Sequence, residues 1–270
     1  MGRIKYDIKY IAFIDILGFR NKVNESINDM KVYANIQKAL KVLLKEKQNK
    51  IKIKGEQITT FSDSIVISYP ANDSDNILLL GKIITFLQME LFKYDMLIRG
   101  GITKGEIHHT KEVVFGPGFN DAYELESKYA IFPRVIMYKE LYDSKIKELG
   151  NYQGYESDIQ IFKNTFAVDS LTNMVYVDVL NCLSELDYLE DYENYLILAR
   201  NLILNSLKKE KSKEVKSKYI WLANYYNKNL NKYKKLINKD EFRIPGKYIK
   251  HWLVIISTIL SIRYINYIYS

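Results

Sequence analysis

Apolar positions repeat with two different periods along the first half of the chain. Runs of β-branched and aromatic side chains predict buried strands, and apolar side chains three or four positions apart predict amphipathic helices. We expect strands at 9–17, 57–62, 64–69, 97–103, 106–114 and 135–137, and helices at 30–44, at 77–91 and from Asn120 onward. This order favours an α+β sandwich in which helices cover one face of the sheet.

Strand signals stop near Leu180, and helical spacing replaces them. Residues 192–207 and 219–230 each predict a helix, and the lysine-rich run between them is expected to be a solvated face. We therefore expect one α+β domain at 1–180 and a helical extension at 181–270.

Composition narrows the class of protein. The 270 residues are 47% hydrophobic and 27% charged, as is typical of a globular chain. A single cysteine, Cys182, excludes an internal disulfide framework and fits a reducing cytoplasm. The first apolar run contains Asp15 and is not followed by a small-residue cleavage site, so we expect no secretory signal and a cytoplasmic location. The apolar stretch 252–269 contains Arg263 and predicts a packed or interfacial helix rather than a membrane span.

The formal charge of +8 permits a polyanionic partner such as a nucleotide or a nucleic acid. Lysines and arginines are spread through the chain and do not cluster beside an aromatic platform. We therefore expect no nucleic-acid partner.

Two acids stand where predicted strands end or turn. Asp15 interrupts the first strand, and Asp63 occupies the break of the 57–69 hairpin. If the two strands are neighbours, both carboxylates meet at one end of the sheet, where divalent cations would neutralise them. Spacing alone leaves another interpretation open, in which Asp15 caps the helix after Gly18 and Asp63 is an ordinary turn residue.

Other sequence signals for chemistry are weak. Gly18 lies between a predicted strand and a predicted helix, where backbone amides can accept phosphate. The histidines, His108, His109 and His251, have no metal-ligand spacing, and we interpret them as structural. The sequence contains no P-loop, no G-x-S-x-G elbow and no H-E-x-x-H motif.

Four segments taken together resemble class III nucleotide cyclases in the same order. They are FIDILGF (13–19), TTFSDSIVIS (59–68), IRGGITKGEI (98–107) and FGPGFNDAYELE (115–126). The particular residues of these motifs, together with FPRV at 132–135 and WLANYYN at 221–227, resemble those of the bacterial pyrimidine cyclases of Pycsar antiphage systems. The resemblance spans roughly residues 9–230.

The resemblance implies a ferredoxin-like catalytic fold that works as a homodimer and cyclises a nucleoside triphosphate. Asp15 and Asp63 match the two metal-binding aspartates, so that two Mn²⁺ or Mg²⁺ ions would be held there. Ile16 would add its backbone carbonyl as a metal ligand, and Phe19 and the amides around Gly18 would lie beside the triphosphate.

Departures from the purine-specific cyclases bear on the substrate. The positions that read adenine in those relatives hold Thr59 and Val113, which cannot make the same hydrogen bonds. The resemblance therefore implies a pyrimidine substrate. Phe61 and Ser62, in the same hairpin as Thr59, are expected to contact it.

A second departure concerns the positive charge at the transition state. Asn120 matches the asparagine that orients the ribose, but Glu124 stands where the resemblance predicts an arginine. Arg134 and Arg99 are the expected substitutes, with Arg99 also placed to contact the base. The structural alternative for Arg134 is an ion pair with Glu124 or Glu126.

The function that the resemblance implies is conversion of UTP to cyclic UMP, which would activate a separate effector during phage infection. Cyclic CMP made from CTP is the alternative product. A catalytically silent nucleotide sensor is the second alternative, because Glu124 replaces the expected arginine.

Overall fold

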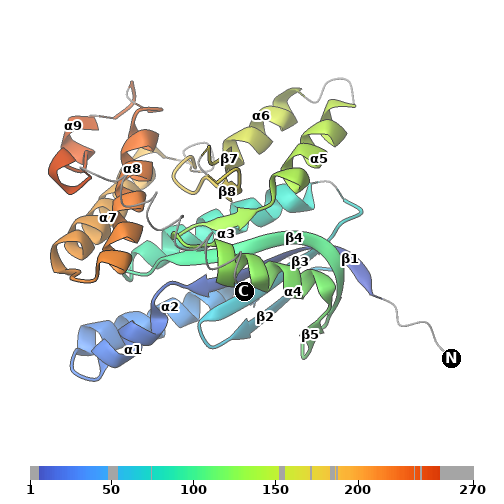
Figure 1. The fold of residues 1–270 in the computed structure, drawn as a ribbon, viewed down its shortest axis with the longest axis horizontal. Helices are drawn as coiled ribbons and strands as arrows, with labels where there is room; N and C mark the ends of the chain where they lie inside the picture. Colours follow the sequence, from blue (N-terminus) through green and yellow to red (C-terminus); the bar gives the residue numbers. More distant parts are fainter. Residues whose placement is uncertain are drawn as a thin grey trace, which may run out of the picture. The chain divides into compact units, whose positions relative to one another are not determined.

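The computed structural model describes residues 6–47, 54–73, 75–151, 156–170, 172–182, 186, 188–233, 235–237 and 239–249 (Figure 1). The chain divides into two compact units, Met1–Cys182 and Leu183–Ser270.

Strands and helices alternate in the first unit. In chain order they are β1 (Asp7–Ile16), α1 (Phe19–Ser26), α2 (Met30–Lys47), β2 (Gln57–Phe61), β3 (Ser64–Pro70), α3 (Asn76–Phe92), β4 (Ile98–His109), β5 (Val114–Phe115), α4 (Pro117–Glu124), the π-helical turn η1 (Leu125–Tyr129), β6 (Val135–Met137), α5 (Lys139–Gly150), α6 (Glu156–Thr165), β7 (Phe166–Val168) and β8 (Val175–Val177).

The sheet has the order β2-β3-β1-β4-β6-β8-β7, and β5 pairs with the end of β4. The central strand β1 is antiparallel to both β3 and β4, and β2 and β3 form a hairpin. Helices join β1 to β2 and β3 to β4, which gives the strand–helix–strand–strand–helix–strand arrangement of a ferredoxin-like fold. The α+β fold predicted from the sequence is thus confirmed.

Helices pack on both faces of this sheet, and the sequence-based expectation of one covered face was incomplete. On one face, Ala12, Ile14 and Ile65 join the apolar sides of α2 and α3 in the larger core. On the other face, Ile11, Phe13, Val66 and Ile107 pack with Ala122 of α4. Figure 1 shows α4 on the opposite side of the sheet from α3. Because side chains alternate along a strand, β1 is apolar at every position from 8 to 14 except Lys9 and serves both cores.

The sequence predicts two strands separated at Gly105, but residues 98–109 form one continuous strand. Gly105 is not a turn. A Cβ atom at Gly105 would lie 2.8 Å from the Cα atom of Gly118 on α4. The glycine therefore lets α4 approach the sheet closely, which is a packing role that looks like a strand break in the sequence.

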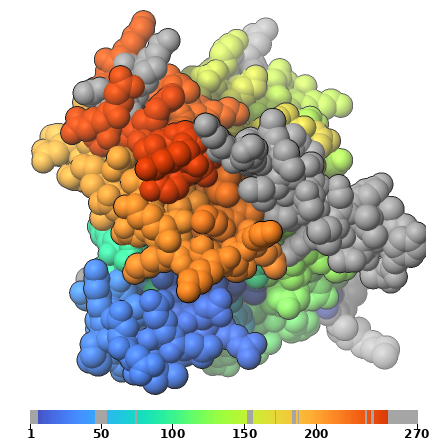
Figure 2. All heavy atoms as spheres, turned by 60° about the vertical axis from the view of Figure 1, so that its left-hand side comes forward, coloured from blue at the N-terminus to red at the C-terminus, as the bar shows by residue number. Residues whose placement is uncertain are grey.

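The second unit is helical in the part that the structure describes. It contains α7 (Leu189–Lys209), α8 (Lys213–Leu230), α9 (Lys239–Phe242) and the short 3₁₀ turn η3 (Gly246–Tyr248). Figure 2 shows the atoms of these helices, in orange to red, packed against one another. The helices predicted at 192–207 and 219–230 are confirmed. Most of the lysine-rich run is exposed, as expected, and α8 begins within it at Lys213, where Ser212 caps the helix by accepting a hydrogen bond from the Val215 amide.

The WLANYYN segment forms the interior of this helical unit. Trp221 and Tyr225 stack with 5.3 Å between ring centroids. Asn227 receives a hydrogen bond from the Ile244 amide and donates one to the Ile244 carbonyl, at 3.0 and 2.9 Å. The residues of the WLANYYN segment therefore have a structural role in the packing of α8.

Within the described residues, none of the helices combines the length and the apolar character that crossing a bilayer requires. The apolar stretch at 252–269, like His251, lies outside the described residues.

Candidate active site

Asp15 and Asp63 come together at one rim of the sheet. Asp15 is the penultimate residue of β1 and lies opposite Ser64 of β3 in the strand register. Asp63 lies in the turn just before Ser64, and its carbonyl accepts a hydrogen bond from the Ile16 amide at 3.2 Å. The Asp63 carboxylate is close enough to raise the pKa of Asp15. The strands are neighbours, as convergence of these acids requires.

The turn that carries Asp63 is conformationally constrained. Ser62 has a φ angle of 51°, in the left-handed region that non-glycine residues rarely adopt. Such a conformation costs on the order of 1 kcal/mol and is concentrated at functional sites. The tight turn aims Asp63 from the hairpin toward the end of β1.

Electrostatics at Asp15 favour a bound cation. Burial raises the pKa of the Asp15 carboxyl, and the nearby Asp63 raises it further. A hydrogen bond from the Ser64 hydroxyl at 3.0 Å and the guanidinium of Arg99, 3.7 Å away, only partly offset this. Two adjacent carboxylates that resist joint ionisation are stabilised by a divalent ion between them.

The donor set fits Mg²⁺ or Mn²⁺ that shares its coordination with a phosphate ligand. In the described ranges, no group of three or more His, Cys, Asp or Glu side chains could hold a metal ion alone. Mg²⁺ in nucleotide enzymes is commonly held by one or two carboxylates, with phosphate oxygens and water completing the octahedron. Asp15 and Asp63, with the adjacent Ile16 carbonyl, would hold the metal.

Arg99 and Glu126 extend the site along β4. Arg99 lies opposite Asp15 in the β1–β4 register, and its Nη2 atom lies 2.7 Å from the Glu126 carboxylate. From the sequence, Glu126 was expected only as a possible ion-pair partner of Arg134, whereas in the structure it forms an ion pair with Arg99. Sequence spacing gives no signal for this pair, because Arg99 lies on β4 and Glu126 in the π-helical turn η1, which only folding brings together.

The start of α1 supplies backbone amides next to the acids. Gly18 precedes the helix with a φ angle of 73°, and it has no side chain to cap the first turn. No acidic residue lies in that turn, whose amides therefore remain suited to an anion. Phe19, the first residue of α1, is only partly exposed and packs against the larger core. Its proposed place beside the triphosphate stays a prediction.

Thr59 is buried within a hydrogen-bonded cluster on the same sheet face as Asp15. Its hydroxyl lies 3.0 Å from Nε2 of His109, whose Nδ1 lies 2.8 Å from the Ser68 hydroxyl. Val113, by contrast, is exposed in the loop before β5. Phe61 and Ser62 are exposed at the end of the same hairpin as Thr59. Contact of these residues with a base stays a prediction.

His109 should make folding stability depend on pH. Burial, with Lys9 and His108 nearby, lowers the pKa of His109 from 6.5 to about 4. The unfolded chain then takes up the proton first, so the stabilising contribution is complete above pH 6.5 and is lost as pH falls toward 4. The loss is on the order of 3 kcal/mol.

Urea unfolding at pH 7 and pH 4.5 checks this expectation. His109→Gln should lose less stability on acidification than the wild-type protein. His108→Gln, at the exposed neighbour, removes only the smallest of the three influences on the pKa of His109 and should lie closer to wild type. Raised pKa values at Asp15 and Glu126 act in the opposite direction, so the difference between variants is the quantity that counts. Equal slopes in all three proteins would contradict the assignment.

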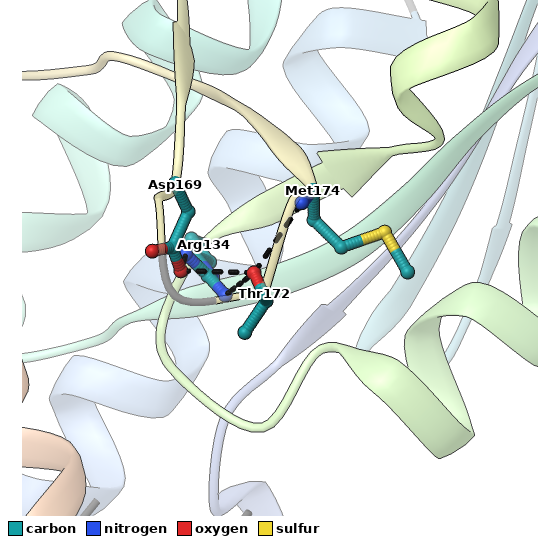
Figure 3. Close-up of polar contacts among 4 residues, drawn as sticks. All are labelled: Arg134, Asp169, Thr172 and Met174. Carbon is teal, nitrogen blue, oxygen red and sulfur yellow. Dashed lines mark hydrogen bonds and ion pairs between the residues drawn. The ribbon is translucent and has the colours of Figure 1, made fainter.

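Arg134 lies in a structural cluster. Its side chain is 3% exposed, and Nη1 donates to Asp169 at 2.5 Å. Nη2 donates a hydrogen bond to the Thr172 hydroxyl at 3.4 Å, and the same hydroxyl oxygen accepts a hydrogen bond from the Met174 amide (Figure 3). The guanidinium lies over the rings of Phe132 and Tyr176. Arg134, the residue before β6, thus connects that strand to the turn between β7 and β8. Its ion-pair partner is Asp169, and not Glu124 or Glu126, which the structural alternative named.

The remaining predicted residue, Asn120, is exposed on α4. Glu124, one turn later on the same helix, forms an exposed ion pair with Lys128 at 2.9 Å. A separate cavity of about 340 Å³ lies among residues of α3, α5 and α6 and contains none of the predicted site residues.

No protein-family model matches the sequence, and no protein with a curated description matches it. Solved structures that match include the adenylyl cyclase CyaB from P. aeruginosa, which is 17% identical, with 64% of this chain and 93% of that chain covered and a TM-score of 0.36. Two structures of a bacterial light-regulated adenylyl cyclase are 14% identical, and each alignment covers 73% of this chain. The alignments cover 58% of the first of these chains and 99% of the second, with TM-scores of 0.36 and 0.38.

Proposed function

We propose that this chain is a nucleotide cyclase, which converts a nucleoside triphosphate to a 3′,5′-cyclic monophosphate and pyrophosphate. The observation that carries the proposal is the meeting of Asp15 and Asp63 at the rim of a ferredoxin-like sheet, next to the start of α1. In the reaction, the ribose 3′-oxygen loses its proton and bonds to the α-phosphorus while the bond to the β-phosphate oxygen breaks.

The residues of the site divide this task. Asp15, Asp63 and the Ile16 carbonyl would hold two Mg²⁺ or Mn²⁺ ions, which would supply Lewis acidity for the cyclisation. The amides after Gly18 orient the phosphates through hydrogen bonds. Arg99 places a positive charge beside Asp15, where Glu124 cannot provide one. Asn120 orients the ribose.

The substrate is proposed to be a pyrimidine triphosphate, with UTP preferred and CTP as the alternative. Thr59 and Val113 support this choice, because a short hydroxyl held by His109 and an apolar side chain lack the hydrogen-bonding groups with which purine cyclases read adenine. The resemblance to Pycsar cyclases supports a role for the cyclic product as a second messenger that acts on a separate effector in antiphage defence.

The working form is proposed to be a homodimer. Four large apolar or aromatic side chains on elements at the α4 side of the sheet are 46–52% exposed: Phe61, Val113, Phe115 and Tyr123. Exposed apolar groups of this kind typically lie at protein interfaces.

A product assay tests the proposal. The protein is incubated with each of the four ribonucleoside triphosphates and Mn²⁺, and the products are identified by mass. We expect cyclic UMP to form fastest and the active protein to sediment as a dimer. A purine product formed fastest would contradict the base assignment.

The second candidate is a catalytically silent nucleotide sensor. Glu124 stands where an arginine is expected and pairs with Lys128, and Arg134, the proposed substitute, pairs with Asp169 in this structure. Binding of a pyrimidine triphosphate without release of pyrophosphate, under either divalent metal, would support the sensor.

A further inference from the structure

Arg99 lies between two carboxylates that differ in their distance from it and in their burial. Its Nη2 atom lies 2.7 Å from Oε1 of Glu126 and 3.7 Å from Oδ2 of Asp15. The Glu126 side chain is 4% exposed, whereas the side chains of Arg99 and Asp15 are 23% and 19% exposed. The ion pair is therefore made with the deeper acid, and Asp15 stays closer to solvent.

Backbone packing holds Glu126 in this position. Gly101, two residues after Arg99 on the same face of β4, has no side chain where η1 crosses the strand. A Cβ atom there would lie 2.4 Å from the Ala122 carbonyl oxygen and 2.5 Å from the Leu125 Cβ atom. Because η1 lies directly on the strand, Glu126 reaches Arg99 from above the sheet, and the π-helical turn sets its direction.

Two carboxylates, those of Asp15 and Glu126, lie within ion-pair distance of one arginine. Burial of Glu126 raises the pKa of its carboxyl, which Arg99 partly offsets. The same Nη2 atom of Arg99 lies 1 Å closer to Glu126 than to Asp15 (2.7 against 3.7 Å), so Glu126 is the closer partner of the guanidinium. If Glu126 carried no charge, Asp15 would be the nearest anionic partner of Arg99.

We propose that Glu126 is a positioning residue that holds Arg99 away from Asp15 and so keeps Asp15 available to a divalent cation. This inference rests on the proposed function. Arg99 is then an internal competitor for the metal, and the Glu126 carboxylate suppresses the competition. A protein that lacks the Glu126 charge should bind metal more weakly because Arg99 closes on Asp15.

Mn²⁺ binding to the nucleotide-free protein, measured by the electron paramagnetic resonance signal of free Mn²⁺, tests the proposal without turnover. Glu126→Gln should weaken Mn²⁺ binding by about tenfold or more, since a competing arginine–carboxylate pair contributes at least about 1.4 kcal/mol. The double variant Arg99→Met with Glu126→Gln should restore binding to within about threefold of wild type. Glu90→Gln, which removes an exposed ion pair with Lys93 on α3, is the matched control and should bind as wild type.

Three results would overturn the proposal. Unchanged Mn²⁺ binding in Glu126→Gln shows that Arg99 does not compete. Weak binding in both the single and the double variant shows that Glu126 is itself a ligand. If Glu126→Gln does not fold, the neutral double variant decides, since weak binding there again rejects the competition.

Asp15→Asn separates failure of this inference from failure of the proposed function. If Asp15→Asn binds Mn²⁺ like wild type, the metal site itself is wrong. If Asp15→Asn loses Mn²⁺ while Glu126→Gln keeps it, only the role of Glu126 is wrong.

Discussion

Asp15→Asn and Asp63→Asn should each lower cyclic nucleotide formation by at least about a hundredfold. Removal of groups that only support metal ligands already costs about 10- to 100-fold, and these aspartates are the proposed ligands themselves. Turnover with UTP and Mn²⁺ is the measurement. Asp143→Asn, a change in an exposed ion pair with Lys139, should retain activity.

The same substitutions should leave the fold intact. Because burial and Asp63 raise the pKa of Asp15, its ionised form destabilises the metal-free protein, and this cost appears as pH rises through the folded-state pKa. Asp15→Asn removes the cost, so the melting temperature at pH 7 without metal should be unchanged or higher. Mn²⁺ should raise the melting temperature of wild type only. Full turnover in either variant would remove the proposed mechanism.

Arg134→Met should destabilise the first unit by about 3–5 kcal/mol. The change leaves the Asp169 carboxylate without its cation and removes the packing of the guanidinium on Phe132 and Tyr176. Breaking one partner of a buried ion pair is costly because the other charge stays in a poorly solvated position. Urea unfolding measures the loss.

A second substitution distinguishes this structural role from a catalytic one. Arg134→Met combined with Asp169→Asn should recover part of the lost stability, because no uncompensated charge remains. The catalytic role predicted for Arg134 would gain support from the opposite pattern, in which stability is unchanged and turnover with UTP is lost.

Hydrophobic spacing along the sequence was sufficient to predict a strand or a helix wherever that element buries one apolar side against a core. The run at 9–17 and the three-and-four spacing at 77–91 predicted β1 and α3, because each pattern is dictated by contact with a core. The short strands β7 and β8 were not predicted, although β6, which also has three residues, was. Gly105 misled the strand prediction because its partner, Gly118, is remote in the sequence.

The candidate site divides in the same way. Position marked Asp15 and Asp63 as candidates, since one acid interrupts an apolar strand and the other stands at a hairpin break, and the resemblance to class III cyclases selected the metal-binding interpretation over an ordinary cap and turn. The partners of the arginines were not recognisable. Arg99 pairs with Glu126 across a strand–helix contact, and Arg134 pairs with Asp169 across a β-turn.

The sequence by itself determined the α+β class and most of the strands and helices of the first unit, and its resemblance to class III cyclases implied the ferredoxin-like fold and the pair of acids. Only the tertiary structure decided which cation pairs with which acid, and that α4 covers the second face of the sheet. The physical reason is range: hydrophobic periodicity is set by neighbours along one element, whereas ion pairs depend on distances of a few ångströms between segments that only folding brings together.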